Sequence, residues 1–320
     1  MTGSSGHRNV GQRVRQRGNV AGVAATLTLV CLLTFAPGVT GATPVAGMPP
    51  VANALPTPDT SGVSSAITAL RSSGGIISSY DGQVISGMDV TGNIRIQHDD
   101  VTVRDSRVNF TSTYGLEVQR KADGSCPVGT LFEYIELNGA LADESDVPLY
   151  GNGCAWTLDR AYVHDVGRAI KVVNDNVVSN SYVVSSRTGD SGSHRGAVGN
   201  NGGRDNMLIN NVLICEGSGC SAAIPMYGDV AAVDGMLVQG NLIATTGSYC
   251  AYGGSVEGMP YPNGSNIRFL DNRFSAQFFD TCGRYGVISG FEQGVRGNVF
   301  TGNVWHETGA TIELPSEEVR

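Results

Sequence analysis

Four basic side chains fall within a short central stretch of the chain, at Arg168, Lys171, His194 and Arg195. Lys171 is one of only two lysines in the sequence, so an ammonium group at this position is a specific choice. A lysine or arginine whose pKa is lowered by burial or neighbouring positive charge can lose its own proton and then take one from carbon, while other cations stabilise the anion that forms. We predict Lys171 or Arg195 as a general base, with His194 and Arg168 neutralising charge or donating a proton. The alternative is that these four residues are ordinary solvated side chains on the surface.

Four further residues flank this stretch, and we predict that they bind substrate: His164, Asp165, Tyr227 and Asp229. His164 precedes His194 by 30 residues, so a repeating fold of that period would place both on one face. Clustered carboxylates can hold Ca²⁺ through oxygen ligands, although the sequence has no Asp-x-Asp-x-Asp loop. Two carboxylates can also act as the acid and base of a glycosidase, or serve only to form turns.

A pattern of eight residues recurs through the body of the chain and must position these side chains. It reads apolar-x-apolar-x, then Asp, Asn or Gly, then Ser or Asn, then x-apolar. Such alternation predicts a short strand on each side of a bend, and spacings of 20 to 31 residues predict a parallel solenoid rather than an antiparallel sandwich. The copies begin at Val101, Thr130, Trp156, Asn176, Met207, Met236, Ile267 and Gln293.

The composition agrees with stacked coils joined by bends. Glycine accounts for 44 of 320 residues and charged residues for only 16%, which excludes a coiled coil, and the glycines lack the period of collagen. The spacing of Val63, Ile67 and Leu70 predicts a short capping helix over 61–71. The segment around Trp305 is predicted to cover the other end.

The N-terminal region has the pattern of an export signal. Four arginines precede an apolar stretch within residues 1–41, and a proline-rich linker follows over 42–59, which leaves residues 60–320 for the solenoid. A retained membrane anchor is the alternative. Without the signal the net charge falls to about −12, which argues against nucleic acid and anionic membranes as partners. We predict a secreted, extracellular protein without stable membrane insertion.

Six cysteines remain outside the predicted signal, an even number that favours disulfides in an exported chain. Six cysteines allow fifteen pairings. Proximity in the sequence favours 126–154, 215–220 and 250–282. A zinc site is disfavoured because there is no Cys-x-x-Cys pair.

Three segments carry a resemblance to a known family. They are DGQVISGMDVTGNIRIQHDDVTVRDSRV from Asp81, RAIKVVNDNVVSNSYV from Arg168 and HRGAVGNNGGRDNMLINNVLI from His194. They resemble secreted bacterial right-handed parallel β-helix proteins of the pectate-lyase-like superfamily, and the similarity covers most of residues 60–310. The family often has Asp-Gly-Ile-Lys-Val and then His-x-Asp-Gly-Ile-Gln. Here the first keeps Lys171 without the Asp-Gly, and the second keeps His194 without the Asp.

The resemblance implies an all-β, right-handed parallel β-helix of roughly eight to nine coils that acts on polysaccharide as a monomer. The predicted reaction is β-elimination on a uronate-containing chain. Ca²⁺ is the one candidate cofactor. A glycoside hydrolase, or a non-catalytic carbohydrate-binding or cell-surface protein, is the alternative, because one fold hosts many functions.

Overall fold

The computed structural model describes residues 54–189 and 194–315, so the predicted signal over 1–41 lies outside the described residues. Within these two ranges the chain forms strands and bends and no α-helix. A 17-stranded sheet contains β1 (Arg71–Ser73), β3 (Val84–Ser86), β4 (Met88–Thr91), β6 (Thr102–Asn109), β8 (Leu131–Asn138), β10 (Trp156–Asp159), β11 (Tyr162–Val166), β13 (Asn176–Ser179), β14 (Tyr182–Ser185), β16 (Gly203–Ile209), β17 (Val212–Cys215), β18 (Val233–Gln239), β19 (Leu242–Thr245), β21 (Arg268–Leu270), β22 (Arg273–Phe274), β24 (Val299–Thr301) and β25 (Val304–Trp305).

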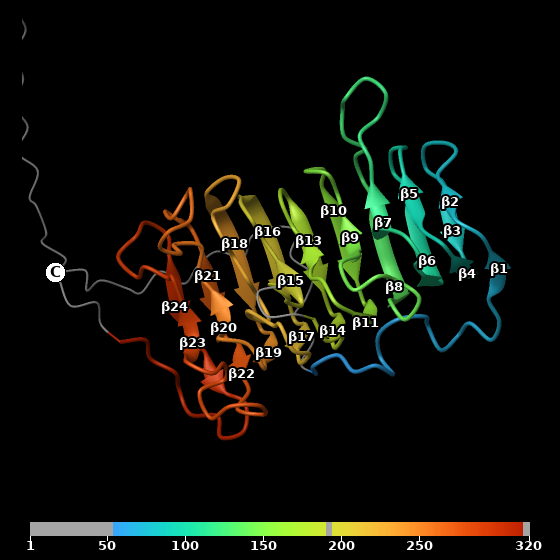
Figure 1. Ribbon diagram of the computed structural model, residues 1–320. Coiled ribbons are helices and arrows are strands. Elements are labelled where there is room, and N and C mark those ends of the chain that lie inside the picture. The colour runs from blue at the N-terminus through green and yellow to red at the C-terminus, as the bar shows by residue number, and fades with distance from the viewer. Residues whose placement is uncertain (1–53, 190–193, 316–320) are drawn as a thin grey trace, which may run out of the picture. The chain divides into compact units, whose positions relative to one another are not determined.

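A second face of the coils is formed by shorter strands, seen toward the viewer in Figure 1. Its six-stranded sheet contains β2 (Ile76–Ile77), β5 (Ile94–Ile96), β7 (Tyr114–Val118), β9 (Val147–Tyr150), β12 (Ile170–Lys171) and β15 (Val198–Gly199). Two single bridges, Asn200 to Met226 and Ile224 to Ala251, continue this face to the pair β20 (Tyr249–Tyr252) and β23 (Gly286–Ser289). We call the whole surface the short-strand face.

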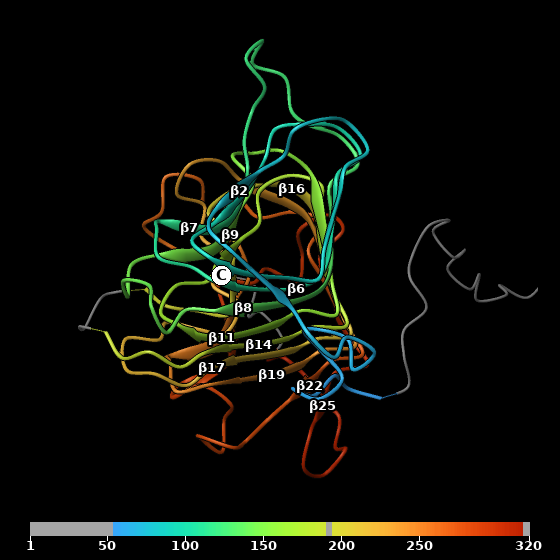
Figure 2. The same ribbon diagram turned by 90° about the vertical axis from the view of Figure 1, so that its right-hand side faces the viewer.

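Each strand pairs in parallel with the equivalent strand of the next repeat, as a parallel β-solenoid requires. Leu158 of β10 aligns with Val178 of β13, which aligns with Leu208 of β16. Across the bend, Val163 aligns with Val183 and then with Leu213. Figure 2 looks along the stack and shows the coils one behind another. The predicted all-β parallel solenoid is confirmed.

The recurring bend is a left-handed backbone residue between two strands. Asp105, Asn180, Asn210 and Asp271 occupy this position with φ between 47° and 55°. Short polar side chains and glycine tolerate that conformation best, which explains the bend chemistry of the repeat. The same position in other coils is taken by Gly87, Tyr134, Arg160, Gly240 and Gly302.

The residue after the bend forms an internal asparagine ladder. The Asn241 side chain is fully buried; its Oδ1 accepts from the Asn211 backbone N at 2.8 Å, and its Nδ2 donates to the Leu208 carbonyl at 2.8 Å. Asn272 and Asn303 repeat both contacts one coil further on. The ladder satisfies backbone groups that the bend withdraws from the sheets.

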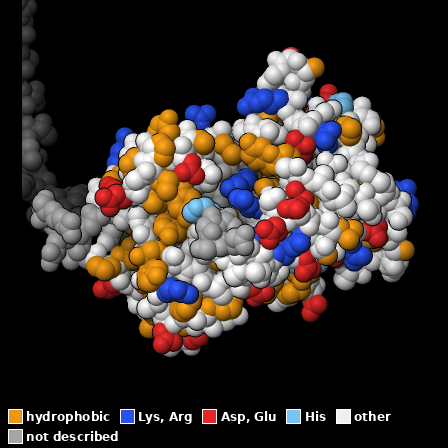
Figure 3. All heavy atoms as spheres, viewed as in Figure 1, with side chains coloured by type: hydrophobic (Ala, Val, Ile, Leu, Met, Phe, Trp, Pro, Cys, Tyr) orange, Lys and Arg blue, Asp and Glu red, His pale blue; other side chains and the backbone are white. Residues whose placement is uncertain are grey.

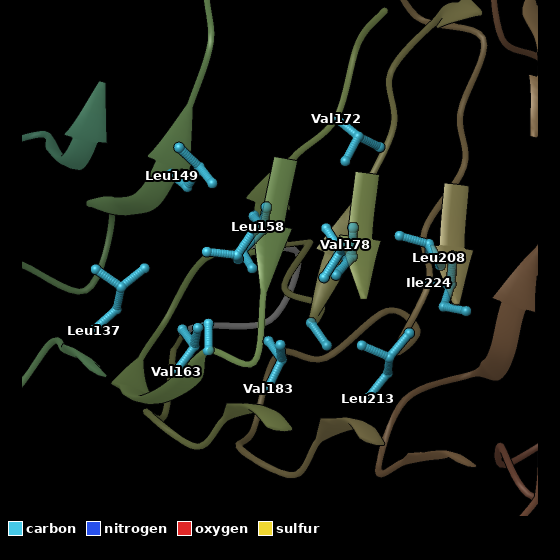
Figure 4. Close-up of a cluster of buried hydrophobic side chains, with 14 of the residues drawn as sticks. Leu137, Leu149, Leu158, Val163, Val172, Val178, Val183, Leu208, Leu213 and Ile224 are labelled. Carbon is cyan, nitrogen blue, oxygen red and sulfur yellow. The ribbon is translucent and has the colours of Figure 1, made fainter. Parts of the chain in front are cut away.

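Alternation along every strand fills the interior with aliphatic and aromatic side chains. In Figure 4 Leu158, Val178 and Leu208 lie in one column and Val163, Val183 and Leu213 in another. All of these side chains are fully buried. The columns keep the coils in register, because a shift by one residue would turn the apolar side chains outward.

The predicted capping helix over 61–71 is wrong. The segment makes a single turn, in which the Ile67 N–H donates to the Ser64 carbonyl at 2.9 Å. Gly62 has φ of 76° and donates to the Arg160 carbonyl, so the segment passes over the outer side of the large sheet. A left-handed glycine and several serines stop a helix from extending. Leu55, at the end of the predicted linker, packs on an outer apolar cluster that contains Val212.

The C-terminal repeat also differs from its predicted position. The sequence pattern predicts the last copy at Gln293, but its strands are β24 and β25, with the bend at Gly302 and Asn303. The error arises because Gly297-Asn298 also forms a left-handed bend, at a different corner of the coil. Beyond β25, Val304 bridges to Thr311 and Ile312 is buried, so this segment folds back on the last coil as expected.

Three disulfides join the cysteines as predicted, 126–154, 215–220 and 250–282. Within residues 54–189 and 194–315, no helix is long and apolar enough to cross a membrane.

Candidate functional site

Lys171 lies on the solvent side of the short-strand face. Ile170 precedes it in β12 and points into the core, so alternation turns Lys171 outward. Lys171 aligns with Tyr150 of β9 on one side and with Gly199 of β15 on the other. The parallel ladder therefore fixes the position of the ammonium-bearing side chain relative to its neighbours in adjacent coils.

The surroundings of Lys171 disfavour its protonated form. Burial lowers the pKa of Lys171, the positive charge of Arg168 lowers it further, and the negative charge of Asp229 partly opposes both. Desolvation and a like charge both disfavour the protonated form. Lys171, Arg168 and Asp229 therefore form one interacting group, which we call the lysine group.

A row of polar and aromatic side chains leads to Lys171 along the same face. The register runs from Arg95 to Glu117, then to Tyr150 and Lys171. The Arg95 Nε lies 3.1 Å from the Glu117 carboxylate, and the Tyr150 ring lies 5.1 Å from that of Tyr114. This row forms a polar surface along the coils, of the kind that an extended ligand can follow.

Tyr227 lies on the other side of the lysine group. It is 9% exposed, it hydrogen-bonds with Ser221 and Tyr252, and Asp229 acts on it electrostatically. Burial is the main cause of a strong rise in its pKa, so the hydroxyl stays protonated at ordinary pH. His194 is exposed beside it, with Nδ1 3.3 Å from the Ser221 Oγ and its ring 6.2 Å from the Tyr227 ring.

These residues border a pocket of about 800 Å³ in the C-terminal coils. Its walls include His194, Tyr227, Tyr252 and Tyr285, and serine and threonine hydroxyls lie between the rings. Figure 3 faces this side, where hydrophobic side chains gather close to a histidine and to basic side chains. We call it the tyrosine pocket.

Neighbouring rings form a continuous series along the tyrosine pocket. Centroid distances are 4.9 Å from Tyr227 to Tyr252, 5.6 Å from Tyr252 to Tyr249 and 6.0 Å from Tyr249 to Tyr285. The series runs from a buried ring at Tyr227 to one that is 65% exposed at Tyr285. Exposed rings held by their neighbours offer a preformed apolar surface to a ligand.

Two disulfides hold the walls of the tyrosine pocket. Cys215–Cys220 closes the loop that contributes Glu216 to Ser221, and Cys250–Cys282 joins the strand of Tyr249 and Tyr252 to the segment that carries Tyr285. Cross-links of this kind restrict how far the walls can separate.

Arg195 is placed differently from the other predicted residues. Its side chain is 2% exposed, with Nη2 3.0 Å from the Glu144 carboxylate and Nη1 donating to the Arg187 carbonyl at 3.1 Å. Gly167 and Gly189 have no side chain where the guanidinium lies, and a methyl group at either position would overlap it. A guanidinium that is buried, ion-paired and bonded to backbone is held inside the fold, so this placement favours a structural role over that of a base.

His164 and Asp165 lie on the large sheet and are not stacked on His194. His164 belongs to β11, where its ring nitrogens lie 2.7 Å from Asp165 and 3.3 Å from Glu136, while His194 lies in the connection from β14 to β15. The predicted period of 30 residues fails here because Tyr162 in β11 aligns with Tyr182, only 20 residues further on. Burial lowers the pKa of His164, but the two carboxylates outweigh it, and the net pKa is raised.

The described part of the chain contains no group of three or more His, Cys, Asp or Glu side chains arranged to hold a metal ion. The lysine group contributes a single carboxylate, fewer than the six to eight oxygens that Ca²⁺ prefers. We therefore derive no chemical step through Ca²⁺.

Sequence reasoning missed several pocket residues, among them Ser221, Arg284 and Tyr285. The available signal was the position of Tyr249 and Tyr285 beside disulfide-bonded cysteines. Comparison with protein-family models, curated proteins and solved structures finds no match to this chain.

Proposed function

We propose that this protein is a secreted enzyme of the pectate-lyase-like superfamily, with a right-handed β-helix of roughly eight to nine coils. The proposal draws on the sequence resemblance, the parallel coils and the three disulfides. Its substrate is a uronate-containing polysaccharide, which it cleaves by β-elimination. It acts as a monomer and binds no nucleic acid, in keeping with its acidic charge.

The observation that carries the reaction class is the lysine group. A lyase needs a base that is neutral near neutral pH and a cation that neutralises the substrate carboxylate as the adjacent carbon loses its proton. The lowered pKa of Lys171 suits the first role, and Arg168 beside it suits the second. Lys171 removes the proton at C5, the C4–O bond breaks, and a C4=C5 double bond forms.

The oxygen that leaves C4 takes a proton on the side of the substrate where His194 and Tyr227 lie. The Tyr227 hydroxyl stays protonated because burial raises its pKa, and His194 lies beside it. Electrons and atoms balance, since the proton taken at C5 is matched by one delivered to the leaving chain end. No added water, oxidant or reductant is required.

The test is incubation with pectate, alginate and glucuronan, with and without chelator, while following the ultraviolet absorbance of the unsaturated product. We expect Lys171→Ala to lower kcat/KM by about 10²–10⁴-fold, the range typical of a general base. Lys121→Ala is the matched control, because Lys121 is the only other lysine and pairs with Asp99 at a distant loop. Absence of unsaturated product from every polymer, with and without added Ca²⁺, rejects the lyase.

The same assay separates the two alternative functions. A glycoside hydrolase would release reducing ends without the absorbance of a double bond. The tyrosine pocket favours a carbohydrate-binding protein as the second candidate, because ring surfaces bind sugars without any base. Sugar binding that survives Lys171→Ala and His194→Ala, with no turnover of any polymer, would establish that function instead.

A further inference from the structure

The tyrosine pocket and the lysine group differ in their polar side chains. The lysine group places two basic side chains beside one carboxylate, while the pocket is lined by one arginine, Arg284, one acid, Glu216, and His194. The Arg284 guanidinium lies over the Phe279 ring at 5.8 Å. The rest of the pocket presents hydroxyls and rings, so its walls offer little to attract an anion.

Rings and hydroxyls in this arrangement match an uncharged sugar. A pyranose ring has an apolar face of C–H groups, which packs on an aromatic ring, and a rim of hydroxyls, which exchange hydrogen bonds with neutral polar groups. Tyr285 supplies exposed ring surface and Tyr252 a half-buried ring, and Ser218, Ser221 and Ser248 supply hydroxyls. A uronate carboxylate in the same place would meet the acid Glu216 as well as Arg284, whose guanidinium lies over the Phe279 ring.

The outer end of the pocket, at Tyr252 and Tyr285, lies too far from Lys171 to hold the sugar that reacts. Along the short-strand face the register runs from Lys171 to Gly199, and the bridges continue it to Pro225 and then to Tyr252. Three steps between strands amount to about 14 Å. Gly199 and Pro225 lie between the two sites and are themselves buried, so a polymer that reaches from the lysine group to the outer end of the tyrosine pocket must span about 14 Å.

We propose that the tyrosine pocket binds a neutral sugar of the same chain whose uronate lies at Lys171. The substrate is then a heteropolymer that contains both uronate and neutral sugars, rather than a homopolymer of uronate. This inference rests on the proposed function, because it takes the lysine group as the place of cleavage. It adds the class of substrate to the class of reaction.

Binding to the pocket is tested by calorimetry with hexasaccharides of glucose, mannose, galactose and xylose, and with a galacturonate hexasaccharide. We expect at least one neutral probe to bind, and Tyr285→Ala to weaken it about two- to tenfold. Tyr80→Ala is the matched control, because Tyr80 is 60% exposed, like Tyr285 at 65%, and lies in the N-terminal coils. No binding of any neutral probe, or an equal loss for the galacturonate probe, overturns the proposal.

Cleavage of polymers separates this inference from the proposed function. We expect rhamnogalacturonan or gellan, which mix uronate with neutral sugars, to give faster elimination than polygalacturonate or alginate, and Tyr285→Ala to remove that preference. Faster cleavage of the homopolymers by both proteins overturns the heteropolymer inference and leaves the lyase intact. Tyr285-dependent binding of a neutral probe without elimination of any polymer rejects the lyase and keeps the pocket as a neutral-sugar site.

Discussion

Lys171 can act as a base only if its neighbours set the pH at which it loses its proton. Asp229 raises the pKa of Lys171 and Arg168 lowers it, so the two neighbours have opposite effects. In Asp229→Asn the negative charge is gone and the Lys171 pKa falls, so the rise of kcat/KM with pH should move to lower pH. Arg168→Gln should move it to higher pH and also lower its plateau.

The measurement is kcat/KM against pH for the wild type and both variants. The opposite directions are the decisive feature, because general damage to the site would lower both plateaus without separating the midpoints. Profiles that shift in the same direction, or coincide, contradict Lys171 as the titrating base. Asp205→Asn serves as the control, because Asp205 is an exposed bend residue on the large sheet.

His164 has a different role at the same scale. Folding raises its pKa, because the bonds to Glu136 and Asp165 outweigh burial. The stabilisation is therefore present below the unfolded pKa of about 6.5 and is lost as pH rises through the folded pKa. His164→Gln should cost about 1 kcal/mol at mildly acidic pH and little at alkaline pH, as measured by urea unfolding. His306→Gln, at an exposed position of the C-terminal segment, is the control.

At the scale of the repeating element, the asparagine ladder makes each coil depend on the next. Removing the Asn241 side chain leaves the Asn211 N–H and the Leu208 carbonyl buried without these partners. We expect Asn241→Ala to lower the free energy of unfolding by about 2–4 kcal/mol, as judged from urea unfolding. Asn263→Ala, at an exposed loop position, is the control, and an equal effect of both would contradict the ladder as a source of stability.

The repeat was predictable from the sequence because one physical requirement recurs in each coil. A left-handed bend needs Asp, Asn or Gly, the next position needs a side chain that can bond to backbone, and alternation fills the core. The path of residues 54–70 was not predictable. The spacing of Val63, Ile67 and Leu70 suits a helix, but it also suits an irregular segment that packs along the outer face of a sheet. Arg195 was misjudged because a charged residue carries no sequence signal of burial.

Site geometry depended on the lengths of connections, which the pattern does not specify. Coils that align residues 20 apart pair Val163 with Val183, so the neighbouring His164 lies on the large sheet, away from His194. The parallel ladder, by contrast, brings Lys171 near Asp229 across coils that are far apart in sequence. The sequence therefore identified Lys171, Arg168, Tyr227 and Asp229 as candidates. It could not show which of the other predicted site residues lie near them in the fold.

At the scale of the whole molecule, the proposed site draws on two regions of one stack. The lysine group belongs to the middle coils and the tyrosine pocket to the C-terminal coils, where Cys250–Cys282 closes a separation of 32 residues. The stability of a solenoid is close to a sum over coils and their interfaces, so a local lesion acts mainly on its own coils. Loss of this disulfide should therefore weaken the pocket before it affects Lys171.

We expect Cys250→Ala/Cys282→Ala to destabilise the C-terminal coils by about 3–4 kcal/mol. Amide hydrogen exchange should quicken in β18 to β25 while β6 and β8 stay protected, and neutral-sugar binding should fall while slow elimination continues. Cys126→Ala/Cys154→Ala removes the disulfide between cysteines 28 residues apart. In this variant exchange should quicken in β6 and β8 while β18 to β25 stay protected. Equal acceleration along the whole stack in both variants would mean that the coils unfold as one unit, so that the pocket and the lysine group could not be loosened separately.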